Sequence, residues 1–77
     1  MYNKENEEAY YLLSLHDLYE GMDVEVLKIA LEDMEISEEY EACGGLSRAI
    51  RFAEKHTREE LIKEYDDTLE RLAQEAD

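Results

Sequence analysis

The chain contains 77 residues, of which 8 are Lys or Arg and 22 are Asp or Glu, so its formal net charge at pH 7 is −14. This charge argues against nucleic acids and anionic membranes as partners, because their phosphate groups would repel the surface. The lack of proline, the single cysteine and the three glycines disfavour β-rich folds and exclude an internal disulfide. We therefore expect one all-α domain and, since no secretion signal or membrane span is evident, a cytoplasmic location.

The chain is expected to begin with a flexible N-terminus, residues 1–7, followed by a single helical domain over residues 8–77. Apolar residues around Leu15 recur at the spacing of one helix face. Gly21 should end this first helix, because glycine adopts a left-handed backbone without a steric clash. Asp23 is a suitable N-cap for a second helix, since its carboxylate can accept hydrogen bonds from the amides of the first turn.

A short third helix is expected over residues 38–42. Ser37 would be its N-cap, and Ile36 and Tyr40 would point into the core. Residues 43–45, Cys-Gly-Gly, would end it, because paired glycines are the strongest local breaker in this sequence. This interpretation places a turn before the fourth helix.

Two further helices complete the expected fold. The fourth covers about residues 46–55, and the fifth runs from Thr57 toward Ala73. Thr57 and Glu60 form the pattern of a capping box, in which each side chain accepts a hydrogen bond from the other residue's amide. No internal repeat or sustained heptad is present, so we expect a compact bundle of five to six short helices.

Residues suited to catalysis are few. The sequence has no nucleophile elbow and no glycine-rich phosphate loop. His16 and His56 could each be a metal ligand or a general base, but they fit better as surface or capping residues of separate helices. Cys43 could be activated by the helix that follows it, although a half-buried thiol at a turn is the simpler interpretation. We expect no enzyme activity, no metal and no cofactor.

Charge is distributed unevenly along the chain. Four basic residues at spacings of three and four form what we call the basic stripe: Arg48, Arg51, Lys55 and Arg58. Six acidic residues that precede them form the acidic ridge: Glu32, Asp33, Glu35, Glu38, Glu39 and Glu41. Because the two surfaces differ, copies of the chain could associate head to tail through them. Alternatively, the basic side chains neutralise carboxylates within the monomer.

Residues 11–69 resemble the effector-associated, death-like domains of bacterial conflict and antiphage systems. Leu12-Leu13-x-Leu15 opens the similar segment, and residues 23–33 are similar to a second helix of the form acidic-x-x-Leu-x-x-Leu. Residues 44–49 match Gly-x-x-x-Arg-Ala, and residues 51–62 are similar to the end of the family's fourth helix and the start of its last one. The resemblance implies a death-fold-like bundle without catalytic residues and an adaptor role.

We therefore expect a non-catalytic adaptor that recruits or clusters effectors through homotypic contacts. Its partners would be proteins with a similar helical domain, including the chain itself. A second hypothesis is an acidic decoy, which mimics nucleic acid and occupies a basic protein groove. A third is a small regulator that binds a partner helix, with Tyr2 and Tyr10 as exposed anchors.

Overall fold

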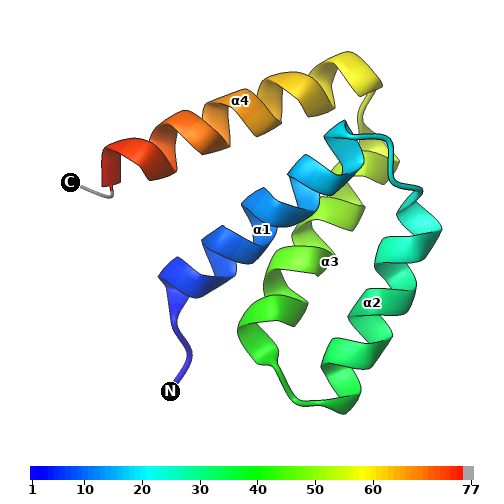
Figure 1. The fold of residues 1–77 in the computed structure, drawn as a ribbon, viewed down its shortest axis with the longest axis vertical. Helices are drawn as coiled ribbons and strands as arrows, with labels where there is room; N and C mark the ends of the chain where they lie inside the picture. The colour runs from blue at the N-terminus through cyan, green and yellow to red at the C-terminus, as the bar shows by residue number, and fades with distance from the viewer. Residues whose placement is uncertain (76–77) are drawn as a thin grey trace.

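A computed structural model describes residues 1–75, which form four helices: α1 (Lys4–Tyr19), α2 (Val24–Ile36), α3 (Tyr40–Lys55) and α4 (Arg58–Glu75) (Figure 1). No strand occurs among these residues, so the predicted all-α class is confirmed. The prediction of five to six helices is wrong for the described chain, because the expected third and fourth helices are one continuous helix, α3. The last two residues of the expected domain over 8–77 lie outside the described residues.

Helix α1 begins four residues earlier than the sequence pattern predicted. The Asn3 side chain accepts a hydrogen bond from the Asn6 amide (3.1 Å), and this cap starts the helix at Lys4. Glu7 thereby becomes part of the helix and is buried. At the other end the chain leaves α1 through Gly21, whose φ of 104° is left-handed, as predicted.

The caps of α2 and α4 are those that the sequence predicted. Asp23 accepts a hydrogen bond from the Glu25 amide (2.9 Å) at the start of α2. Before α4, the Thr57 amide donates to Glu60 Oε1 (2.8 Å) and the Glu60 amide donates to Thr57 Oγ1 (3.2 Å), which completes the capping box. Both caps depend only on neighbouring residues, so the local sequence is sufficient to specify them.

The link between α2 and α3 differs from the prediction. Ser37 is the C-cap of α2 rather than the N-cap of a short helix, and Glu38 turns the chain with a left-handed φ of 58°. Ile36 is 81% exposed and Tyr40 is 61% exposed, so their predicted core positions are wrong. Ile36 follows the buried Leu27 by about two and a half helical turns, which places it on the opposite side of α2.

The Cys43-Gly44-Gly45 segment is part of α3 and not a turn, so the predicted helix break is wrong. A Cβ atom at Gly45 would lie 2.6 Å from the amide nitrogen of Tyr11 and 2.7 Å from the carbonyl oxygen of Glu7. Only glycine therefore allows the backbones of α1 and α3 to approach this closely. Packing between two helices, rather than a need for a turn, explains why glycine stands here.

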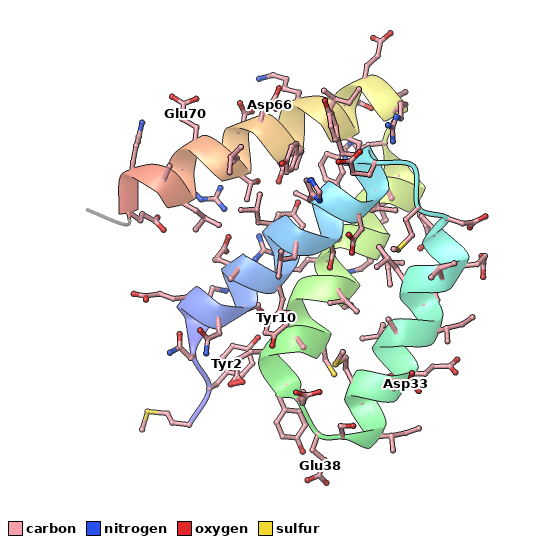
Figure 2. The ribbon with its side chains drawn as sticks, in the orientation of Figure 1. Tyr2, Tyr10, Asp33, Glu38, Asp66 and Glu70 are labelled. Atoms are coloured by element: carbon pink, nitrogen blue, oxygen red, sulfur yellow. The ribbon has the colours of Figure 1, made fainter. Side chains whose placement is uncertain are left out.

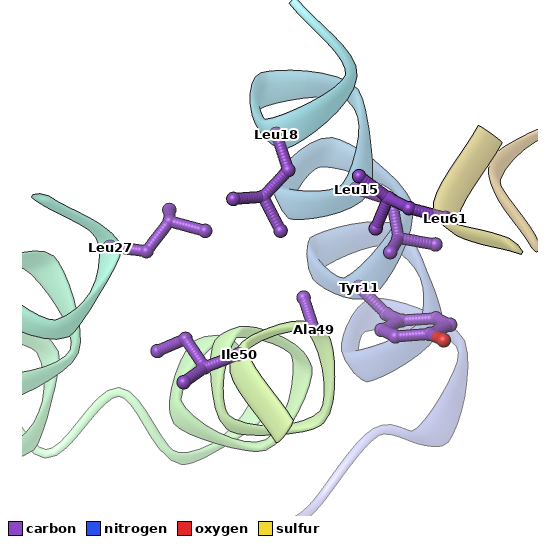
Figure 3. Close-up of a cluster of buried hydrophobic side chains, with 7 residues drawn as sticks. All are labelled: Tyr11, Leu15, Leu18, Leu27, Ala49, Ile50 and Leu61. Carbon is purple, nitrogen blue, oxygen red and sulfur yellow. The ribbon is translucent and has the colours of Figure 1, made fainter. Parts of the chain in front are cut away.

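The core lies where α1 crosses α3, with α2 and α4 contributing from either side (Figure 3). α1 and α3 share the largest contact, α2 packs mainly against α3, and α4 lies across α1 (Figure 1). The core cluster consists of Tyr11, Leu15, Leu18, Leu27, Ala49, Ile50 and Leu61.

The molecule is flat, with extents of 33 × 32 × 18 Å. The smallest extent is less than two helix diameters, each about 10 Å. The accessible surface is 5286 Å², whereas a compact monomer of this mass exposes about 4,900 Å². A thin shape of this kind leaves α2 and α4 as edges with outward faces that no other helix covers (Figure 1).

Candidate interaction surface

Arg48, the first residue of the basic stripe, lies against α1. Its guanidinium donates to Glu8 Oε1 (2.8 Å) and Glu7 Oε2 (3.3 Å), and it lies 4.2 Å from the centre of the Tyr11 ring. All three partners belong to α1, so Arg48 connects α3 to α1. The alternative that basic side chains neutralise carboxylates within the monomer therefore holds for Arg48.

The two carboxylates beside Arg48 belong to a wider polar cluster. Glu7 accepts a hydrogen bond from the Tyr2 hydroxyl (2.5 Å), and this bond is the main reason that the pKa of Glu7 is lowered. Glu8 also pairs with Arg71 of α4 (2.6 Å). Burial alone would raise the pKa of Glu8, but the hydrogen bonds and charges of Arg48 and Arg71 outweigh burial and lower it. Both groups are held ionised, and the cluster connects three helices.

Arg58, the last residue of the stripe, caps the end of α1. Its guanidinium donates to the carbonyl oxygens of Leu18 (2.5 Å) and Tyr19. Carbonyls at a helix C-terminus lack partners in the helix itself, and a positive charge there also complements the helix dipole. Arg58 is therefore engaged within the molecule, like Arg48.

Arg51 and Lys55 are the stripe residues that point to solvent. Both are exposed, and neither has an ion-pair partner within residues 1–75. They lie one turn apart on α3, and together with Phe52 and His56 they line a shallow depression on the surface. The Phe52 and His56 rings stack with 4.0 Å between their centres. Arg51 and Lys55 are therefore the two residues of the basic stripe that are free to contact another molecule.

The acidic ridge occupies the second half of α2, the link and the start of α3, where Asp33 and Glu38 are marked in Figure 2. Five of its residues are exposed and Glu41 is half-buried. None of the six forms an ion pair with any residue that the structure describes, and the ion pair joining α2 to α3 is Lys28–Glu54 (2.8 Å) instead. The ridge and the two free basic residues are thus not paired with each other inside the molecule.

Sequence reasoning missed an apolar strip on the side of α2 that faces away from α3. We call this strip the α2 outer face, and it consists of Val26, Ile29, Asp33 and Ile36. The signal was present in the sequence, because α2 carries apolar residues on two opposite sides. Leu27 and Leu31 mark the side that packs against the core, whereas the prediction for the opposite side concerned Ile36 alone, as a core residue.

The surroundings of His16 and Cys43 differ from those that a metal ligand or a reactive thiol requires. The His16 ring packs against Tyr65 with 5.6 Å between ring centres, and the described part of the chain holds no cluster of His, Cys, Asp and Glu suited to a metal ion. Burial raises the pKa of the Cys43 thiol, and the charges of Glu35 and Glu39 raise it further. A thiol with a raised pKa is a poor nucleophile at neutral pH.

The described residues thus define a small, acidic, all-helical domain. Over residues 1–75, none of the helices is long and apolar enough to cross a membrane. Comparisons with protein-family models, with curated proteins and with solved structures found no match for this chain. The resemblance to death-like domains stays a prediction that rests on the sequence motifs.

Proposed function

We propose that this chain is a non-catalytic interaction module that clusters or recruits partner proteins through head-to-tail contacts, in the manner of death-like adaptors of bacterial conflict systems. The observation that carries the proposal is the separation of unpaired charge. The exposed carboxylates of the acidic ridge lie on α2 and the link, whereas Arg51 and Lys55 lie on α3. Surfaces of opposite charge that are not used inside one molecule can pair between molecules.

Two of the four basic-stripe residues are engaged within the monomer and are not free to bind another copy. Arg48 and Arg58 hold α1 in place, so reversing their charge would disrupt the fold as well as any surface. Arg51 and Lys55 make no such contact within residues 1–75. The contact between copies is accordingly assigned to these two residues and the acidic ridge.

Such contacts would be weak one by one and sensitive to salt. Exposed ion pairs contribute about 0.2–1 kcal/mol each. They are also screened beyond a Debye length of about 8 Å at physiological salt. Head-to-tail contacts between unlike surfaces generate rings or open chains of copies. We therefore expect assembly that grows with protein concentration and declines with salt.

Light scattering after size exclusion, over a concentration series at low and physiological salt, tests the proposal. We expect the mass to rise with concentration and Lys55→Glu to reduce that rise. Lys63→Glu is the matched control, because it makes the same change in charge at another exposed lysine, whose ion-pair partner within residues 1–75 is Asp67 on α4 (3.1 Å). Equal loss in both variants would show an effect of net charge alone and would contradict the assignment.

The second hypothesis, an acidic decoy, is favoured by the same unpaired ridge if the chain stays a monomer at every concentration. A monomer throughout would refute the homotypic form of the proposal. The decoy predicts salt-sensitive binding to a basic protein that is distributed over many carboxylates. It also predicts that Lys55→Glu leaves such binding intact, which separates the two functions.

A further inference from the structure

The α2 outer face carries exposed apolar residues that the packing of the fold does not require. Val26 is 49% exposed, Ile29 is 61% exposed and Ile36 is 81% exposed. Their spacings of three and seven residues place them along one side of the helix. Single exposed apolar residues are common on protein surfaces, but here three of them lie in line on a single helix.

These side chains bring little benefit to α2 itself. Val and Ile are β-branched and therefore weaker helix formers than Ala, Glu or Lys. The buried side of α2 already supplies its packing, through Leu27 together with Val24 and Leu31. A strip of exposed apolar residues on an edge helix is the usual form of a helix-binding surface, in which anchors recur at i, i+3, i+4 and i+7.

The charges along this strip determine the kind of partner. Asp33 lies within it, between Ile29 and Ile36, and Glu32 lies beside it. Neither carboxylate has an ion-pair partner among the described residues. An apolar strip with unpaired carboxylates is complementary to an apolar strip flanked by cations.

We propose that the α2 outer face binds an amphipathic helix of a partner protein whose apolar side is flanked by Lys or Arg. The α2 outer face of a second copy is disfavoured as the occupant, because two such faces packed together would place their carboxylates against each other. The helix is about 20 Å long, so it can accommodate about three to four turns of a partner. This surface does not include Arg51 or Lys55, but it shares Asp33 with the acidic ridge, so a bound partner helix would compete with head-to-tail clustering.

The test uses the isotope-labelled chain at a concentration and salt at which it is monomeric. The probe is a synthetic helical peptide of about 14 residues, with Leu on one side and Lys on the flanks. A peptide of the same composition in scrambled order keeps the charge but has no apolar side. We expect the first peptide to shift the NMR signals of α2 amides and to bind at least about tenfold more tightly than the scrambled one.

Two single variants locate the contact. Ile29→Ser should weaken binding of the Leu/Lys peptide at least about tenfold, whereas Leu13→Ser should change it less than about twofold. Leu13 is the matched control, because it is an aliphatic residue of almost equal exposure, 59%, on α1. Circular dichroism of both variants should match the parent chain, since neither side chain belongs to the core.

Three results would overturn the proposal: no binding of the Leu/Lys peptide, equal binding of the scrambled peptide, or equal effects of the two variants. The peptide test and the clustering test can fail separately, because the first measures binding to the monomer and the second measures association between copies. A chain that stays monomeric but binds the peptide refutes homotypic clustering and retains this surface. A chain that clusters but does not bind the peptide gives the reverse result.

Discussion

The contact at Gly45 offers the most direct test of how α1 and α3 pack. A methyl group added there would lie within 2.7 Å of two backbone atoms of α1, in Tyr11 and Glu7. Backbone atoms in a helix cannot move aside singly, so the helices would have to separate. At Gly44, the preceding residue, the three nearest atoms to an added Cβ belong to side chains: the Tyr2 hydroxyl, the Glu7 carboxylate and Glu7 Cγ.

Both substitutions to alanine gain the same helix propensity, but they differ in the cost of overpacking. Replacing glycine by alanine inside a helix favours folding by about 1 kcal/mol. Overpacking a tight contact costs about 1–3 kcal/mol, and rigid backbone neighbours place Gly45→Ala at the upper end. We expect Gly45→Ala to lower the free energy of unfolding by about 2 kcal/mol. Gly44→Ala should stay within about 1 kcal/mol of the parent chain, because the side chains beside it can rotate away.

Urea unfolding followed by far-UV circular dichroism measures both variants. The loss is large against the total stability of about 4–12 kcal/mol expected for a chain of this length. In thermal unfolding the same loss corresponds to a midpoint lowered by about 8–16 °C. A Gly45→Ala chain as stable as Gly44→Ala would refute the close approach of the two helices and would restore the interpretation of this segment as a turn.

Two further predictions concern the polar cluster. Arg48→Ala should lower the free energy of unfolding by about 2 kcal/mol, because it leaves Glu7 and Glu8 without a shared cation at a partly buried site. Arg51→Ala should change the free energy of unfolding by less than about 0.5 kcal/mol. Equal effects of the two variants in denaturant unfolding would contradict the division of the basic stripe into engaged and free residues. The hydrogen bond to Glu7 raises the pKa of Tyr2 from 10.0 to about 12, so its stabilising contribution is complete below pH 10 and is lost as the pH rises through about 12. Spectrophotometric titration should show that Tyr2→Phe removes a tyrosine that ionises near pH 12. If the variant instead lacks a tyrosine that ionises near pH 10, the hydrogen bond to Glu7 is disproved.

Local signals in the sequence were sufficient for the features that neighbouring residues determine. Asp23, Gly21 and the Thr57–Glu60 capping box act within a few residues of the helix ends that they define. The prediction for Gly45 was wrong because its role depends on Glu7 and Tyr11 of α1, which lie more than thirty residues earlier in the chain. A glycine pair has the same local signature whether it forms a turn or allows a neighbouring helix to approach.

For the candidate surface, too, local spacing predicted the positions of residues but not their contacts with other helices. Helical spacing correctly placed Arg48, Arg51 and Lys55 along α3. Spacing alone could not separate Arg48 from the others, because its partners Glu7 and Glu8 come from another helix. The α2 outer face could have been predicted from the sequence, since its apolar residues repeat at helical spacing on the side opposite the core residues of α2.

The edge position of α2 has a consequence for how the protein opens. In the chain, α2 lies between α1 and α3, yet in space those two helices contact each other directly and α2 packs mainly against α3 (Figure 1). The segment from the end of α1 to the start of α3 can therefore detach as a unit while the α1–α3 contact stays closed. Such sub-global opening has a lower free energy than global unfolding. A partner bound to α2 would shift this equilibrium toward the closed state, so occupancy of the surface and order of the helix would be thermodynamically linked.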